Sequence, residues 1–124
     1  MRSKLLALVL ALSLAGPAFA NPDKPDLASL ARQAVSEDAS ESTHAIEALR
    51  AAGPAGFEAF LSAHHEAIEA RCKEVASDHP PAASMAWQRT SRALDAIAGQ
   101  KDSFASRLFW YTDFEQAVAA ARLA

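Results

Sequence analysis

Residues 55–77 repeat their apolar side chains with the period of an α-helix, and this stripe dictates the fold class. It consists of six residues spaced three or four apart: Phe57, Leu61, His64, Ile68, Cys72 and Val75. Side chains at that spacing lie on one face of a helix, and the charged residues of the stretch lie mostly off it. Gly53-Pro54 precedes the stretch and Pro80-Pro81 follows it, and both pairs interrupt helices. The stretch therefore predicts one long helix with a buried face at the centre of the molecule.

Four further helices are expected from the same signals. They span residues 27–34, 42–52, 82–98 and 112–122. Polar connections separate them at residues 36–42 and 100–106. Asp26 is placed to cap the first of these helices, Ser42 or Thr43 to begin the second, and Gly99 to end the third. Trp87, Leu94 and Ile97 are expected to face inward, and Asp95 outward.

Residues 47–64, EALRAAGPAGFEAFLSAH, resemble one helix–turn–helix unit of a HEAT-like α-solenoid. A solenoid stacks about three or more units to bury a continuous core, and only one unit is recognisable here. The predicted fold is therefore mainly α. We expect a small bundle of α-hairpins over residues 27–106, followed by an aromatic, strand-like segment and a short helix over residues 107–124.

The N-terminal segment 1–20, MRSKLLALVLALSLAGPAFA, has the pattern of a secretory signal peptide. Arg2 and Lys4 precede an apolar run, and Ala18-Phe19-Ala20 forms a small-residue cleavage site. The run is shorter than the ~20 apolar residues that a membrane span needs. We expect cleavage at this site, a proline-containing linker at 21–26, and export to the periplasm or out of the cell, with no attachment to the membrane.

The mature chain is acidic, which limits its partners. Arg2 and Lys4 leave with the signal peptide, so 10 of the 12 basic residues remain against 15 acidic ones, a net charge of −5. Nucleic acids and anionic membranes repel such a chain. The partner that we expect instead is a protein, or a second copy of this chain, bound through the aromatic segment near the C-terminus.

Cys72 is the only cysteine. An exported domain held by disulfides contains an even number of cysteines. With a single cysteine, this fold has to be held by packing. The chain has no Cys-x-x-Cys pair, no nucleophile elbow and, with four glycines, no phosphate-binding loop. A cysteine in the middle of a helix also lacks the neighbouring base and the lowered pKa that a nucleophile needs. We expect no enzymatic activity and no cofactor.

His65, Glu69 and Cys72 form a candidate metal site. Their spacing of four and three residues places them roughly on one side of a helix, and imidazole, carboxylate and thiolate all bind zinc. Cys72 also belongs to the apolar stripe, where a packed thiol is the alternative, and His65 and Glu69 then form a solvated pair. A helical metal-binding protein is therefore one hypothesis.

Leu108-Phe109-Trp110-Tyr111 is a run of four bulky residues with high strand preference. They cannot all face inward on one strand, because alternate side chains point to opposite faces. Thr112 has Glu115 three residues after it, a capping-box pattern for a final helix. The candidate interaction surface comprises five residues: Leu108, Phe109, Trp110, Tyr111 and Phe114.

Residues 93–124 resemble a segment of exported bacterial proteins that carry a thioredoxin-like domain. In that family a tryptophan-containing lead-in, here Phe109-Trp110-Tyr111, precedes an N-terminal helix of the type D-x-E-x-A, here Asp113 to Ala117. The resemblance implies that residues 107–124 begin such a domain, and that the chain is a shortened form without the central sheet and the redox-active segment. No functional residue of the family has a counterpart here.

Two functional hypotheses follow besides the helical metal-binding protein. The first is an exported helical protein without identifiable catalytic activity that carries the start of a thioredoxin-like domain. The alternative is an exported, all-α protein–protein interaction module.

Overall fold

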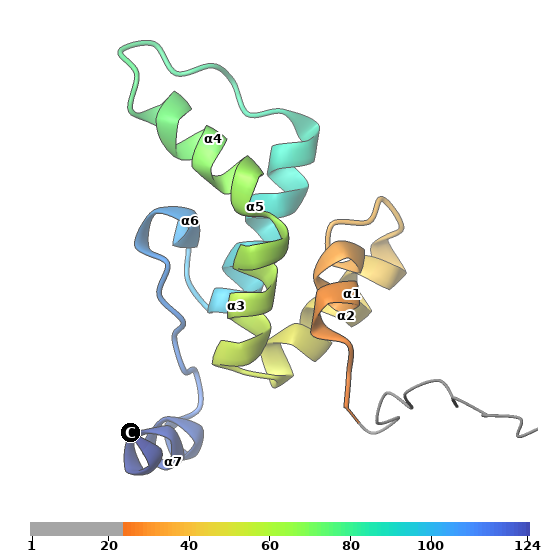
Figure 1. The fold of residues 1–124 in the computed structure, drawn as a ribbon, viewed down its shortest axis with the longest axis vertical. Helices are drawn as coiled ribbons and strands as arrows, with labels where there is room; N and C mark the ends of the chain where they lie inside the picture. Colours follow the sequence, from red (N-terminus) through yellow and green to blue (C-terminus); the bar gives the residue numbers. More distant parts are fainter. Residues whose placement is uncertain (1–23) are drawn as a thin grey trace, which may run out of the picture.

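The computed structural model describes residues 24–124, which fold into seven helices without a strand (Figure 1). In chain order these are α1 (Leu27–Gln33), α2 (Ala39–Ala51), α3 (Pro54–Ala63), α4 (His65–Val75), α5 (Met85–Ala98), α6 (Ser103–Ser106) and α7 (Phe114–Leu123). The prediction of a mainly α, small helical bundle is confirmed for this part of the chain. The expected signal peptide, 1–20, and positions 21–23 of the expected linker lie outside the described residues.

The helix α2 begins inside the segment that was expected to be a polar connection. Its N-cap is Asp38, whose carboxylate accepts a hydrogen bond from the backbone N–H of Glu41 at 2.9 Å. The predicted start at Ser42 or Thr43 is wrong, because the earlier aspartate satisfies the unpaired amide donors of the first turn. The predicted cap of α1 is confirmed, since Asp26 occupies the same position there.

The turn between α2 and α3 brings the two helices into backbone contact. Gly53 has a φ of 68°, which glycine adopts at little cost, and Pro54 follows as the first residue of α3. In the first turn of α3, a Cβ atom on Gly56 would lie 2.0 Å from the carbonyl oxygen of Leu49. The α-hairpin expected within residues 47–64 is therefore present, and it closes this tightly because Gly56 has no side chain.

The long helix expected over residues 55–77 is wrong, because the chain breaks at His64. This residue has φ −114° and ψ 19°, outside the helical range, and it separates α3 from α4. Its Nε2 lies 2.8 Å from the carbonyl oxygen of Ala31 in α1, and its ring packs 4.4 Å from that of Phe60. Beyond the break α4 turns away from the core (Figure 1). As a result Val75, expected on the buried stripe, is 42% exposed.

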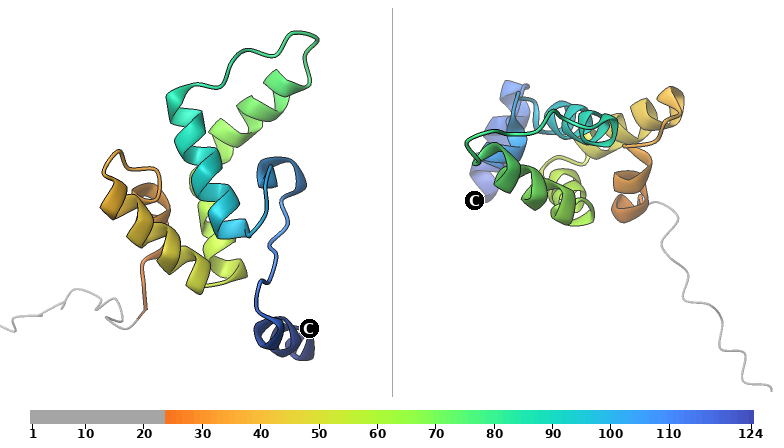
Figure 2. Two further views of the ribbon diagram at one scale, coloured as in Figure 1. Left: turned by 180° about the vertical axis from the view of Figure 1, so that it is seen from behind. Right: turned by 90° about the horizontal axis from the view of Figure 1, so that it is seen from above.

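The core lies where α3 packs against α1, α2 and α5 (Figures 1 and 2). Its buried apolar residues are Ala31, Ala34, Ala45, Leu49, Phe57, Phe60, Ile68, Ala93, Leu94, Ile97 and Ala98. Each of α1 to α5 contributes to this set, and five of its members are alanines, which allow helix axes to approach closely. Helix α7 contributes none of its residues.

The end of α5 organises the chain that follows it. Gly99 takes the left-handed conformation, with φ 77°, and ends α5 as predicted. Asp95, expected to face solvent, turns instead toward the next segment. Its Oδ1 accepts from the backbone N–H of Ser103 at 3.0 Å and from the hydroxyl of this fully buried serine at 2.7 Å. These bonds fix the short helix α6 within the expected connection 100–106.

Candidate functional site

The C-terminal segment, residues 107–124, leaves the bundle and ends in a helix that lies apart from the others. Figures 1 and 2 show α7 separated from the bundle by the extended residues that precede it. The helix makes no extensive contact with any of α1 to α6. This segment contains all five residues of the expected interaction surface, so its attachment to the bundle decides what that surface presents.

Arg50, in the last turn of α2, holds the beginning of the segment. Its guanidinium donates hydrogen bonds to the carbonyl oxygen of Ile97 at 2.8 Å, to the carbonyl oxygen of Trp110 at 2.6 Å and to Oγ1 of Thr112 at 3.1 Å. The same group lies 4.4 Å from the centre of the Phe109 ring, a cation–π contact. One planar side chain with five donors thereby joins α2, the end of α5 and the segment.

A backbone hydrogen bond and a bond from the Gln100 side chain to the carbonyl oxygen of Leu108 at 2.7 Å add to this attachment. The N–H of Trp110 donates to the carbonyl oxygen of Ala98 at 2.8 Å, so the segment and Arg50 together satisfy carbonyls at the end of α5. Gly99 leaves room for them, since a Cβ atom there would lie 3.0 Å from the carbonyl oxygen of Trp110. The strand expected at 108–111 is wrong, because its partner is a helix terminus with few free carbonyls instead of a second strand.

The side chains of the extended segment alternate between the bundle and solvent. Phe109 points inward, 6.1 Å from the ring of Phe57 and 5.0 Å from that of Tyr111. Leu108 and Trp110 point outward and are 56% and 55% exposed. Of the expected interaction surface, Phe109 and Tyr111 therefore belong largely to the attachment of the segment to the bundle through Arg50, which we call the anchor. Leu108 and Trp110 face solvent.

Helix α7 continues the exposed apolar surface. Its N-cap is Asp113, which accepts from the backbone N–H of Gln116 at 2.9 Å. The predicted cap, Thr112, is wrong because its hydroxyl is bound by Arg50. Phe114 at the start of the helix is 82% exposed.

The candidate metal residues are not gathered around one point. His65 is exposed, Glu69 forms an ion pair with Arg107, and Cys72 is half-buried with its Sγ 4.0 Å from the carbonyl oxygen of Phe104. Within residues 24–124, no three His, Cys, Asp or Glu side chains lie close enough together to hold a metal ion.

The ion pair of Glu69 and Arg107 shifts both ionisation equilibria. The hydrogen bond and the positive charge of Arg107 lower the pKa of Glu69 below its usual value. The same hydrogen bond, which Arg107 donates to Glu69, raises the pKa of Arg107. Both side chains are at least partly exposed, so this pair ties residue 107 to α4 at the surface.

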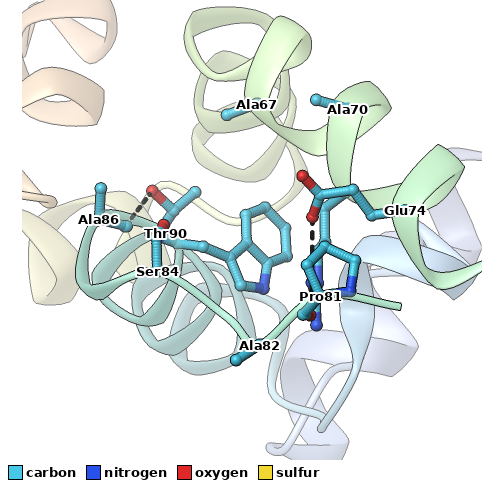
Figure 3. Close-up of a pocket in the computed structure, with 10 residues that line it drawn as sticks. Ala67, Ala70, Glu74, Pro81, Ala82, Ser84, Ala86 and Thr90 are labelled. Atoms are coloured by element: carbon cyan, nitrogen blue, oxygen red, sulfur yellow. Dashed lines mark hydrogen bonds and ion pairs between the residues drawn. The ribbon is translucent and has the colours of Figure 1, made fainter. Parts of the chain in front are cut away.

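A second candidate site is a cleft of about 290 Å³ that lies between α4 and α5 (Figure 3). Trp87 lines the cleft and packs edge-on against Phe104, with ring centres 5.4 Å apart. Arg71 closes one side by binding Glu74 and the carbonyl oxygen of Pro81, each at 3.0 Å. The sequence predicts Trp87 as an inward residue but not the cleft, because the break at His64 is what tilts α4 away from α5.

The anchor also contains a residue that the sequence does not single out. Arg50 resembles any basic residue in the last turn of a helix, a common and mostly solvated position. The only local signal for its role is its position just before the tight turn into α3.

Comparisons of the chain with family models, with curated proteins and with solved structures each found no match. Among the described residues, no helix combines the length and the apolar composition that crossing a bilayer requires.

Proposed function

We propose that the chain is an exported protein-binding module, in which α1 to α6 form the scaffold and residues 107–124 form the binding surface. One observation carries this proposal. Of the six large apolar side chains that are exposed in residues 24–124, four lie in this final segment: Leu108, Trp110, Phe114 and Leu123. Apolar side chains concentrated on one exposed segment are typical of an interaction site.

The attachment of the segment supports this proposal. A disordered tail would have to be ordered on binding, at a cost in conformational entropy. Here Arg50 and the backbone of Trp110 already hold the first residues of the segment in place. The outward side chains Leu108 and Trp110 are therefore presented in a fixed direction, which favours binding.

Export remains part of the proposal on the sequence alone. The signal-peptide pattern of residues 1–20 supports it, and the net charge of −5 after removal of that segment favours a protein partner over nucleic acid or membrane.

A second candidate is that residues 107–124 are the beginning of a thioredoxin-like domain. The resemblance of residues 93–124 supports it, and so does the exposed apolar side of α7, because a helix that packs on a sheet has such a side. A Lys-Pro pair and an apolar strand encoded in frame after Ala124 would favour this candidate over the binding module.

The binding module is tested with a photo-activated cross-linking amino acid placed at Phe114 in the exported protein. Illumination of the cells that make it should yield covalent adducts at this position. The matched control carries the same amino acid at Glu47, an exposed position in the middle of α2. Adducts at neither position, or at both equally, would contradict the proposal.

A further inference from the structure

We propose that the binding surface takes a second copy of the same chain, with the two α7 helices paired antiparallel about a two-fold axis. This inference rests on the proposed function, because it names the partner of that same surface. It follows from the order of the residues along α7: two copies of this helix that run in opposite directions are complementary in side-chain size and in charge.

The apolar face of α7 pairs large side chains with small ones when the helix is reversed. Phe114, Ala117, Val118 and Ala121 share this face at spacings of three and four residues. The midpoint of the face lies close to Val118. In an antiparallel pair, Phe114 of one copy therefore lies over the alanine-rich end of the other, near Ala121. The two Val118 side chains meet at the axis.

The charges of α7 select this orientation. Glu115 and Arg122 lie seven residues apart, two helical turns, and therefore on the same flank of the apolar face. Both line one shallow groove of the helix together with Phe114 and Val118. Neither forms a salt bridge within the part of the chain that the structure describes. These two charges are thus available to a partner.

In the antiparallel pair, these opposite charges meet at two places, one at each end of the interface. Glu115 of each copy faces Arg122 of the other, because both are the same distance from the midpoint of the helix. A parallel pair would instead place this flank of the two copies on opposite sides of the interface, where Glu115 and Arg122 do not meet. Charge complementarity of this kind sets partner choice and orientation more than affinity.

The size of the interface sets the expected strength. A ten-residue helix is only about 15 Å long, so even with Leu108 and Trp110 at its edge the interface is of the small, transient class, below roughly 1,200 Å². Pairing also stabilises α7, since helices shorter than about 12–15 residues are marginal without tertiary packing. We therefore expect a reversible dimer whose fraction rises with concentration.

Charge reversal tests the pairing. Sedimentation of the mature chain over a range of concentrations measures the dimer Kd. Glu115→Arg and Arg122→Glu should each raise it roughly tenfold, because two attractive contacts become repulsive. The double variant, and an equimolar mixture of the two single variants, should regain the original Kd. Glu47→Arg makes the same charge change on α2 and should have no effect. Equal behaviour of Glu115→Arg and Glu47→Arg would overturn the inference.

Cysteine cross-linking tests the orientation. In a Cys72→Ala background, Val118→Cys should form an intermolecular disulfide on oxidation, because the two copies meet at this position. Phe114→Cys should not, since its two copies are about 14 Å apart along the axis, beyond the ~7 Å that a disulfide bridges. Equal cross-linking at both positions would indicate a parallel pair, and none at either would exclude the dimer.

The photo-adduct at Phe114 separates this inference from the proposed function. An adduct with twice the mass of the mature chain supports the dimer. An adduct of this chain with a different protein, from a chain that sediments only as a monomer, leaves the binding module standing and overturns the dimer.

Discussion

Replacing Arg50 with alanine should release the C-terminal segment while the bundle stays folded. Within residues 24–124, Arg50 is the only side chain that hydrogen-bonds to both Trp110 and Thr112, and it also covers the ring of Phe109. Without it, two polar attachments of these residues remain: the backbone bond from Trp110 to Ala98, and the bond that the Gln100 side-chain amide donates to the carbonyl oxygen of Leu108 at 2.7 Å. We expect residues 108–113 to open and close as a local unit, separately from α1 to α5.

The structure gives the size of this effect. The two hydrogen bonds to the segment are exposed, so each contributes at the lower end of the usual range, about 0.5–1 kcal/mol. The cation–π contact with Phe109 adds about 0.5–1 kcal/mol at a partly exposed site. Together they stabilise the closed segment by about 2 kcal/mol. Their loss should raise the population of the open state roughly thirtyfold.

Hydrogen exchange of the Trp110 amide measures this opening directly, because that amide is hydrogen-bonded only while the segment is closed. Arg50→Ala should speed its exchange roughly thirtyfold, and Thr112→Val, which removes one exposed bond, roughly threefold. The Phe60 amide in the core serves as the reference for global unfolding.

Two results would refute this account of Arg50. Unchanged exchange of the Trp110 amide in Arg50→Ala would mean that the guanidinium does not hold the segment. An equal acceleration at Phe60 would mean that Arg50 stabilises the whole bundle, through its bond to the carbonyl oxygen of Ile97, and that the segment is no separate unit.

Three further predictions concern other parts of the molecule. The exported protein should begin at Asn21, which its intact mass reports. Ile68→Asp should lower the free energy of unfolding by several kcal/mol, because it places an unpaired charge at a site 2% exposed; Glu66→Gln, on the exposed side of the same helix, should leave the thermal melt unchanged. The tie between Glu69 and Arg107 should be fully present above the usual pKa of a glutamate and be lost as the pH falls through the lowered pKa of Glu69. A carboxyl NMR titration follows that loss.

Each of these has a result that contradicts it. A mass that includes residues 1–20 would contradict cleavage of a signal peptide. Equal melting of the Ile68 and Glu66 variants would mean that the buried face of α4 is assigned wrongly. Titration of Glu69 at its usual pKa, or no change in it when Arg107 is replaced with glutamine, would show that the ion pair does not form in solution.

The sequence predicts best those boundaries that a single residue type determines locally. Gly99 ends α5 and Gly53-Pro54 separates α2 from α3 because no other residues meet those backbone demands as cheaply. The break at His64 has no such signal, since the apolar stripe runs through it without interruption. It depends on the contact of the His64 ring with the carbonyl of Ala31, 33 residues earlier in the chain, and no local pattern contains that contact.

The same division applies to the candidate site. The surplus of apolar residues at 108–114 is visible in the sequence, and so is the fact that they cannot all be buried on one strand. Their anchor is not visible, because Arg50 is separated from Trp110 by 60 residues. The candidate metal residues are a converse case: His65, Glu69 and Cys72 have a suitable spacing, yet Glu69 binds Arg107 of a segment that helical spacing cannot place.

The anchor determines which side chains the binding surface presents. In an extended chain alternate side chains point in opposite directions. Once Phe109 packs against Arg50 and Phe57, Leu108 and Trp110 have to point outward. Leu108 and Trp110 are therefore exposed because Arg50 binds the carbonyl oxygen of Trp110, which fixes the side chains that face the bundle. Their exposure does not require a lack of apolar partners. The scaffold and the binding surface are for this reason not independent, and a variant that frees the segment should weaken binding at α7 even though it leaves every residue of α7 in place.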